Sequence, residues 1–338
     1  MRILSIETSC DETAAALVDA KGGLKNPRFK VIRNEVSSQI VLHRPYGGVE
    51  PSLARREHIK NLPAVCEAVV KEKDWKDIDA VAVTVGPGLE IALWTGIDFA
   101  KELAKKYKKP LLGANHLEGH LYSPLLSLKE KIRNPKLPAI GLVVSGGHTI
   151  LFVLEDIDKW KKIGETKDDA VGEAFDKVAR LLELPYPGGP EIQRIAEKGN
   201  AKSVNFPRPM LNQKNFDFSF SGLKTSVLYY LRDKKLTPKL KADVAASFQM
   251  AAVETLVEKT IKAAWEHRAK SIFLAGGVAS NKLLRETLSK RAKKEGLAFY
   301  MPEFKYSTDN AAMIAVAAYM NYEKGKKYRI NAQANLNL

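Results

Sequence analysis

Apolar and polar residues follow one another in blocks that predict short buried strands and longer helices. Apolar runs bounded by polar turns predict strands at Ile3–Ile6, Thr13–Asp19, Phe29–Val36, Asp79–Val85, Leu111–Ala114, Ala139–Val144, Thr149–Glu155 and Ser271–Ala275. Helical periodicity predicts helices at Pro51–Lys73, Leu89–Lys106, Val171–Leu182, Lys239–His267, Asn281–Lys294 and Asn310–Glu323. Strands that alternate with helices in this way are typical of an α/β protein.

The order of these elements occurs twice along the chain. The strand–turn–strand unit at the amino terminus has a second copy around the turn Ser145–His148. The strand followed by Gly86-Pro87-Gly88 has a second copy in Ser271–Ala275, which is followed by Gly276-Gly277. Two βββαβαβα halves that face each other across a ligand cleft form the actin-like (ASKHA, ribonuclease H-like) arrangement. Because glycine turns at the carboxyl ends of strands let a backbone approach a phosphate, we expect all three turns to lie near a ligand.

The domain boundaries follow from this repeat. With 338 residues the chain exceeds the usual size of one hydrophobic core. We predict an N-terminal actin-like domain over residues 1–134 and a C-terminal one over residues 135–306, with an insertion near residues 170–241. Residues 307–325 should form a helix that returns to the first domain. The short polar tail Asn331–Leu338 should be disordered or bound to a partner.

Charge and cysteine content narrow the functional classes. The 54 Lys and Arg residues outnumber the 39 Asp and Glu residues and give a formal net charge of +15. This excess favours a polyanionic partner, above all nucleic acid, although lysine- and glutamate-rich helices can also be solvated surfaces. Cys10 and Cys66 should be free thiols, and the first residues read as a buried strand, not as a signal peptide. We therefore expect a cytoplasmic protein without a membrane span.

The segment Asn115–His120 contains the pair most typical of a metal site. His116 and His120 are four residues apart, so on a helix both imidazoles face the same way and could bind one transition-metal ion. In zinc proteases a glutamate follows the first histidine directly, and here that place is taken by Leu117. The spacing thus indicates a metal and not a protease, although two satisfied surface histidines would look the same.

Six motifs carry a resemblance to a known family over nearly the whole chain: Ser5–Thr13, Asn115–His120, Val144–Thr149, Asp168–Lys177, Pro187–Pro190 and Gly276–Asn281. In this order and spacing they resemble the signatures of the tRNA threonylcarbamoyladenosine transferases, a family also described as glycoproteases. Val144 stands where some archaeal members have tyrosine, which, with the chain length, resembles the bacterial branch.

The resemblance implies an acyl transfer to tRNA. The threonylcarbamoyl group would pass from threonylcarbamoyl-AMP to the exocyclic amine of the adenosine just 3′ of the anticodon, in tRNAs that read codons beginning with A. It implies one divalent metal ion, iron or zinc, held by His116, His120 and Asp309. Asp309 could instead cap the helix that follows it. The implied partners besides tRNA are an actin-like-fold paralogue and a small P-loop ATPase.

The resemblance also implies the residues that contact the donor: Thr8, Ser9, Val143, Val144, Ser145, Gly146, Gly147, Asp176, Gly189 and Asn281. Residues 143–147 would hold the phosphate and the carbamoyl group, Asp176 and Gly189 the ribose, and Asn281 the adenine side. Gln193 stands where an acidic residue is common in the family, so a ribose role for it is doubtful. Asp11 or Glu12 could accept the proton of the attacking amine, although polar turn residues are often structural.

Two other classes remain alternatives. An ATPase or sugar kinase of the actin-like fold commonly has Asp-x-Gly in the first hairpin, and this chain has Glu7-Thr8-Ser9 there. A nucleic-acid-binding metalloprotein without catalysis would leave the ribose-side aspartate unused. Incubation with the donor and unmodified tRNA separates both classes from a transferase.

Overall fold

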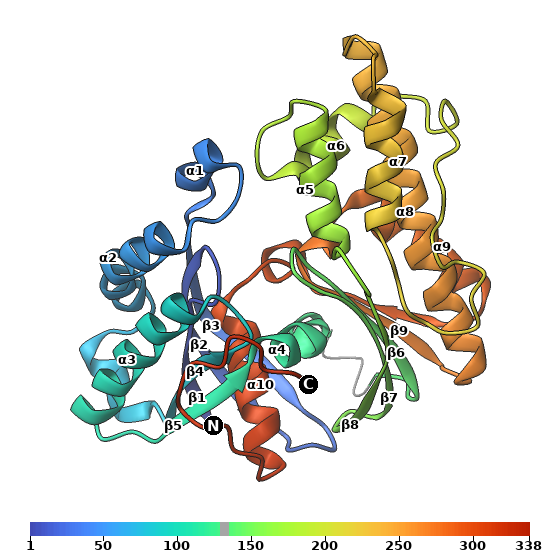
Figure 1. Cartoon of the computed structure of the whole chain (residues 1–338). Helices are drawn as coiled ribbons and strands as arrows, with labels where there is room; N and C mark the ends of the chain where they lie inside the picture. The colour runs from blue at the N-terminus through green and yellow to red at the C-terminus, as the bar shows by residue number, and fades with distance from the viewer. Residues whose placement is uncertain (129–134) are drawn as a thin grey trace. The chain divides into compact units, whose positions relative to one another are not determined.

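The computed structural model describes residues 1–128 and 135–338, and the chain forms two compact units (Figure 1). Unit 1 comprises Met1–Asn134 and Pro302–Leu338, and unit 2 comprises Pro135–Met301. Residues 129–134, at the end of the first predicted domain, lie outside the described residues. Each unit contains one five-stranded sheet with both parallel and antiparallel neighbours and several helices, so the predicted α/β class is confirmed.

Unit 1 is built on a sheet of strand order β3-β2-β1-β4-β5. Its strands are β1 Arg2–Glu7, β2 Glu12–Lys21, β3 Arg28–Ser38, β4 Ala80–Gly86 and β5 Leu111–Asn115. Its helices are α1 Ile40–His43, η1 Arg44–Tyr46, α2 Pro51–Val69, η2 Glu72–Asp77, α3 Glu90–Lys106, α4 His116–Tyr122, η3 Ser123–Ser127, η5 Phe304–Tyr306 and α10 Ala311–Glu323. Strands β1, β4 and β5 run parallel, so their carboxyl ends meet at one edge of the sheet.

Unit 2 is built on a sheet of order β10-β9-β6-β7-β8. Its strands are β6 Ala139–Val144, β7 Thr149–Asp156, β8 Lys159–Glu165, β9 Ser271–Ala275 and β10 Ala298–Tyr300. Its helices are α5 Val171–Leu181, α6 Gly188–Ala196, α7 Ser221–Leu231, α8 Pro238–Glu266, η4 Gly277–Ser280 and α9 Lys282–Lys294. Read from the other edge, this order repeats that of unit 1, with β6 in the place of β1 and β9 in the place of β4.

Two strands and two α-helices of unit 2 are not predicted by the sequence pattern. Strand β8 is rich in lysine and lies at one edge of the sheet, and strand β10 has only three residues. Helices α6 and α7 lie in the region that we predicted as an insertion. Glycine and proline open α6, and the loop before α7 is rich in Asn and Phe, so neither helix has a clear start signal.

Helix α10 is the buried element of unit 1. Its sequence is apolar on every side, and it is buried from Ala311 to Asn321. A helix with this composition must be covered all round, and α10 packs against α4 and strands β1, β2 and β5. The packing brings the residues just before α10 to the carboxyl ends of β1 and β5. No helix among the described residues is both long and apolar enough to span a membrane.

The expectation of a disordered or partner-bound tail is wrong for this structure. The amide of Gln333 donates to Val85 O over 2.8 Å, and the amide of Gly88 donates to Ala334 O over 3.1 Å. Leu336 packs against the core of unit 1 together with Tyr328, Ile330 and Ala332. The tail therefore covers the Gly86–Gly88 turn, which is occupied by the protein's own chain and not open to a ligand.

Candidate functional site

The two histidines of the Asn115–His120 motif lie on one face of α4. Strand β5 ends at Asn115, whose side-chain oxygen accepts hydrogen bonds from the amides of Leu117 (2.8 Å) and Glu118 (3.3 Å) and so starts the helix. His116 is the first residue of α4, and His120 follows one turn later. The two ring centroids are 4.7 Å apart, and all seven residues of α4 are buried. The predicted pairing of the imidazoles is present in the fold.

Asp309 completes a cluster that fits a metal ion. Its Oδ1 atom lies 3.0 Å from His120 Nε2 and 3.5 Å from His116 Nε2, and the three ligand atoms lie within 4.8 Å of one another. Although His120 Nε2 lies this close to the Asp309 carboxylate, neither ring nitrogen of the buried His120 side chain makes a hydrogen bond within the described part of the chain. Buried polar atoms are rarely left in this state. Two imidazoles and one carboxylate suit zinc or iron, so these residues could hold such an ion.

Helix α10 is capped by Asn310 and not by Asp309. The side-chain oxygen of Asn310 accepts the amide of Met313 over 3.1 Å. Asp309 therefore is not needed as the cap, and its carboxylate is directed at the histidines.

Glu7 is a site residue that sequence reasoning missed. Its Oε2 atom lies 3.0 Å from His116 Nδ1 and accepts the hydroxyl of Thr84 over 2.7 Å. Ser9 Oγ lies 3.1 Å from the same ring nitrogen. A carboxylate on one imidazole nitrogen fixes the ring so that the other nitrogen can bind a metal. The available signal was an acidic residue at the end of an otherwise apolar strand, β1.

The charges of this cluster determine its protonation. Burial lowers the pKa of His116, but the carboxylates of Asp309 and Glu7 raise it more, to about 9. Burial raises the pKa of Glu7, while the adjacent His116 imidazolium lowers it below the usual value. Without a metal, His116 is thus a cation between two carboxylates at neutral pH, and a bound metal would take the place of its proton.

The polar turn between β1 and β2 lies beside the cluster. The Thr8 hydroxyl donates to Ala92 O over 2.9 Å, which ties the turn to α3. Asp11 is buried, and its Oδ2 atom has no hydrogen-bond partner among the described residues. Burial raises the pKa of Glu12 well above its usual value, and the charges of Asp11 and Asp309 raise it further. Glu12 therefore lies within electrostatic reach of Asp309, and Asp11 lies within reach of Glu12.

In unit 2 the residues Ser145–His148 form a tight turn after β6. The Ser145 amide donates to His148 O over 2.8 Å, and the Ser145 hydroxyl accepts the His148 amide over 3.2 Å. Gly146 and Gly147 are exposed, and a Cβ atom on either would have no neighbour within 4 Å. Packing therefore does not require these glycines, and the open space leaves their backbone accessible to a ligand.

The amino terminus of α5 is pressed against this turn. A Cβ atom on Gly172 would lie 2.5 Å from Ser145 O, and the Glu173 amide donates to Gly146 O over 3.1 Å. The positive end of the α5 dipole thus lies at the turn, which favours an anion there.

The remaining predicted residues of unit 2 gather at the same edge of the sheet. The Asp176 carboxylate accepts the Gly188 amide over 2.6 Å and so holds the first turn of α6, where a Cβ atom on Gly189 would have no neighbour within 4 Å. A Cβ atom on Gly276 would lie 2.2 Å from Val144 O, so the turn after β9 lies directly against the end of β6.

Asn281 continues from that turn. It caps α9 through the Leu284 amide (3.0 Å) and donates to Gln249 Oε1 over 2.8 Å. Gln193, where an acidic residue was expected, accepts the Lys282 amide over 2.8 Å. Gln249 and Gly172 are residues that sequence reasoning missed, because their roles depend on contacts between distant segments.

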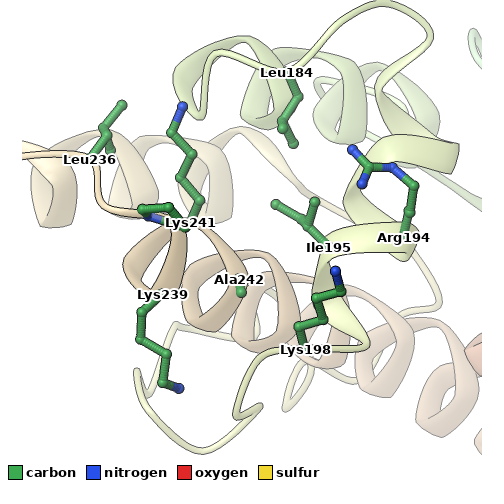
Figure 2. Close-up of a pocket in the computed structure, with 9 residues that line it drawn as sticks. Leu184, Arg194, Ile195, Lys198, Leu236, Lys239, Lys241 and Ala242 are labelled. Carbon is green, nitrogen blue, oxygen red and sulfur yellow. The ribbon is translucent and has the colours of Figure 1, made fainter.

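A separate cavity of about 480 Å³ lies between α6 and α8 (Figure 2). Its floor is apolar, with Leu184, Ile195 and Ala242, and its rim is basic, with Lys198 and Lys241 among the lining residues. None of the predicted site residues lines it. The cavity is therefore distinct from the turns described above.

Comparisons with known proteins place these observations in a family. The sequence profile of the family described as tRNA N6-adenosine threonylcarbamoyltransferase (TsaD) matches residues 30–316. A protein of that name from Thermosipho melanesiensis is 48% identical over 340 residues, covering 100% of both chains. Another from Moorella thermoacetica is 49% identical over 324 residues, covering 95% of this chain and 92% of the relative.

Solved structures resemble the chain in fold. HypF of T. kodakarensis matches 96% of this chain with 48% of its own, at a TM-score of 0.63 and 15% identity. Component A of (R)-2-hydroxyglutaryl-CoA dehydratase from Acidaminococcus fermentans matches 94% of this chain and 98% of its own, at a TM-score of 0.50 and 13% identity. At these identities the likeness concerns the fold alone, and it supports the actin-like assignment.

Proposed function

Because this chain belongs to the tRNA N6-adenosine threonylcarbamoyltransferase family and is a tRNA-modifying transferase, we propose that its donor is threonylcarbamoyl-AMP and that its acceptor is the adenosine just 3′ of the anticodon. The acceptor tRNAs would be those that read codons beginning with A. The observation that carries the proposal is the His116, His120 and Asp309 cluster with Glu7 behind it, beside a polar turn. A phosphoryl-transfer enzyme of this fold would have no evident use for two buried imidazoles there.

The donor is a mixed anhydride with AMP as its leaving group, so no ATP is consumed in the transfer itself. The chain then has to position the donor, stabilise charge on the leaving phosphate and remove one proton from the attacking amine. The open backbone at Gly146 and Gly147 and the amino terminus of α5 suit the phosphate. Val143, Val144 and Ser145 would complete this phosphate and carbamoyl cradle.

For the rest of the nucleotide, Asp176 and Gly189 would contact the ribose and Asn281 the adenine side. The open space in front of Gly189 supports this role. Asp176 and Asn281 already hold the backbone of α6 and α9, so they would contact the ligand from fixed positions.

In unit 1, His116, His120 and Asp309 would hold one divalent ion, iron or zinc. The ion would supply a Lewis acid for the threonylcarbamoyl group. Glu7 would hold the proton on His116 Nδ1, which keeps Nε2 available as a ligand. Thr8 and Ser9 would contact the threonylcarbamoyl group, and Asp11 or Glu12 would accept the amine proton.

The chain would act in the cytoplasm, with tRNA as its macromolecular substrate. An actin-like-fold paralogue and a small P-loop ATPase are the further partners that we propose, as the resemblance to the bacterial branch of the family implies.

The direct test is to incubate the pure chain, alone and with those two partners, with threonylcarbamoyl-AMP and unmodified tRNA, and then to digest the tRNA to nucleosides. The expected product is threonylcarbamoyladenosine, and it should be lost in His120→Ala. Formation of product at the same rate in metal-free protein would contradict the role of the ion. Absence of product under every condition, despite donor and tRNA binding, would contradict the proposed reaction.

A further inference from the structure

Glu118 is a charged residue in the middle of the metal motif that the proposed reaction does not use. It lies between His116 and His120 on α4, and its side chain is 0% exposed. At two residues from either histidine, it points to the other side of the helix. Among the described residues it is not part of the metal-ligand cluster. A carboxylate buried this deeply is stable only with strong partners.

The lysine and amide partners of Glu118 come from the chain after Asp309, and Tyr328 from the same stretch also hydrogen-bonds to its carboxylate. Lys326 Nζ lies 2.8 Å from Glu118 Oε1, and Asn321 Nδ2 lies 2.5 Å from Glu118 Oε2. Asn321 belongs to α10, and Lys326 opens the C-terminal segment, by which we mean Lys326–Leu338. The carboxylate thus connects α4 to two later elements of unit 1.

These contacts fix the helices that hold the proposed ligands. Asp309 lies two residues before α10, while both histidines lie on α4. The two helices are in close contact, because a Cβ atom on Gly119 would lie only 3.1 Å from Met313 Cγ. Any sliding of α4 along α10 would change the distances between the imidazoles and the Asp309 carboxylate. Glu118 resists that sliding, because each of its oxygens has a partner on the opposing elements.

The C-terminal segment contacts the same region at a second place. Gln333 and Ala334 bond to the backbone of Val85 and Gly88. The next residue, Leu89, donates its amide to Ser9 O over 2.8 Å, and Ser9 Oγ lies against His116 Nδ1. The segment is therefore built into the surroundings of His116 from two sides.

We propose that Glu118, paired with Lys326 and Asn321, is a positioning residue that holds His116 and His120 in register with Asp309. Through Lys326, the C-terminal segment then helps to hold the three metal ligands in place. The inference rests on the metal site proposed above, but not on the transfer reaction. Residues that orient the ligands of a metal site typically change metal affinity by about 10–100-fold when they are replaced.

The test is a titration of the metal-free full chain with Co²⁺, followed by its visible absorption, because cobalt reports on ligand geometry without any catalytic assay. Lys326→Met removes the charge from an exposed position and should weaken Co²⁺ binding about tenfold or more. The matched control is Lys327→Met, which removes the same charge from the next, exposed residue and should bind Co²⁺ like the wild type. Glu118→Gln should weaken binding to a similar degree.

The double variant Glu118→Gln/Lys326→Met should bind Co²⁺ no more weakly than either single variant, because both changes remove the same ion pair. Circular dichroism of each variant at the temperature of the titration separates this effect from loss of the fold. Wild-type affinity and an unchanged cobalt spectrum in folded Lys326→Met would overturn the proposal. If His120→Ala also bound Co²⁺ like the wild type, the metal site itself would be wrong, and the inference would fall with it.

Discussion

At the scale of single residues, the position of Glu7 decides which nitrogen of His116 is available to a metal. The carboxylate lies on the Nδ1 side, and Asp309 lies on the Nε2 side. A protonated imidazole can satisfy both carboxylates, and so can a neutral imidazole with a metal on Nε2. A metal ion could therefore replace the proton on His116 Nε2 while the imidazole ring stays in place.

Replacement of Glu7 by Gln should separate this role from simple packing. Glutamine has nearly the same shape but no charge, so it no longer raises the basicity of the imidazole. Metal affinity should fall by about 10–100-fold, while the variant stays folded. Metal content after dialysis against buffered Zn²⁺ measures the effect. Glu90→Gln, on the exposed first turn of α3, is the control and should retain the wild-type metal content. Equal metal content in both variants would contradict the role of Glu7.

Lys259 shows a different use of a buried charge. It lies in α8 with 1% exposure, and its ammonium donates to Asp217 O (2.6 Å) and Asn215 O (3.1 Å). Burial and, to a smaller extent, the charge of the nearby Lys262 together lower its pKa to about 8, against the opposing charge of Asp217. The lysine thus anchors the loop before α7 at the cost of keeping an ammonium inside the protein.

The lowered pKa of Lys259 predicts that the free energy of unfolding depends on pH. The pKa of Lys259 is about 8 in the folded chain, and its ordinary value is 10.5. Between about pH 8 and pH 10.5 this lysine is therefore mostly neutral in the folded chain but still protonated in the unfolded chain. The free energy of unfolding should therefore rise with pH across that window, by about 1–3 kcal/mol from this group. Urea unfolding at several pH values measures the rise. It should disappear in Lys259→Met and largely persist in Lys262→Met. A rise that is the same in all three proteins would rule out Lys259 as its source.

At the scale of elements, the glycines of unit 2 fall into two kinds that a sequence cannot distinguish. Gly172 lies where α5 touches the Ser145 turn and has no room for a side chain, whereas Gly147 faces open space. Gly172 is needed for close packing, whereas Gly147 leaves its backbone accessible to a ligand.

Alanine substitutions should separate the two kinds. Gly172→Ala should destabilise the fold by about 1–3 kcal/mol, because a methyl group is forced into a packed contact. Gly147→Ala should leave the free energy of unfolding within about 1 kcal/mol of the wild type but weaken binding of threonylcarbamoyl-AMP and AMP about tenfold or more. Calorimetric titration and urea unfolding measure both quantities. Wild-type nucleotide affinity in Gly147→Ala would show that the open turn does not contact the donor.

Much of this fold was predictable because its strands and long helices have clear periodicity. Strands such as β1 and β9 and the helix α8 lie close to their predicted bounds. The pair His116 and His120 could be recognised from spacing alone. Helix α6 could not be assigned, since Gly188, Gly189 and Pro190 at its start are turn residues in most contexts.

The parts of the site that escaped prediction depend on contacts between distant segments. Glu7 reaches His116 across 109 positions of sequence, and Lys326 reaches Glu118 across 208. The polar composition of the last residues suggested disorder, but backbone hydrogen bonds and a few apolar side chains fix them to the edge of the sheet. Periodicity reports on local structure, so it does not detect pairings of this kind.

At the scale of the whole molecule, the two units repeat one strand order but place different chemistry at the carboxyl ends of their parallel strands. Unit 1 has imidazoles and carboxylates there, and unit 2 has glycine amides and a helix amino terminus. The repeat explains how one architecture can supply both a proposed metal site and a proposed phosphate site. Neither site accounts for the charge of the chain, because lysine and arginine are spread over both units.

The formal net charge of +15 should appear as salt-dependent binding of tRNA to the isolated chain. Each phosphate that a lysine or arginine neutralises releases counterions, so the logarithm of affinity falls with the logarithm of salt by about 0.7–0.9 per contact. With about four contacts, affinity should drop roughly 50–150-fold between about 50 and 200 mM KCl. Fluorescence anisotropy with labelled unmodified tRNA measures this slope. Transfer from saturated donor and tRNA should change much less over the same range. A flat binding curve would mean that the basic excess is a solvated surface and that a partner protein holds the tRNA.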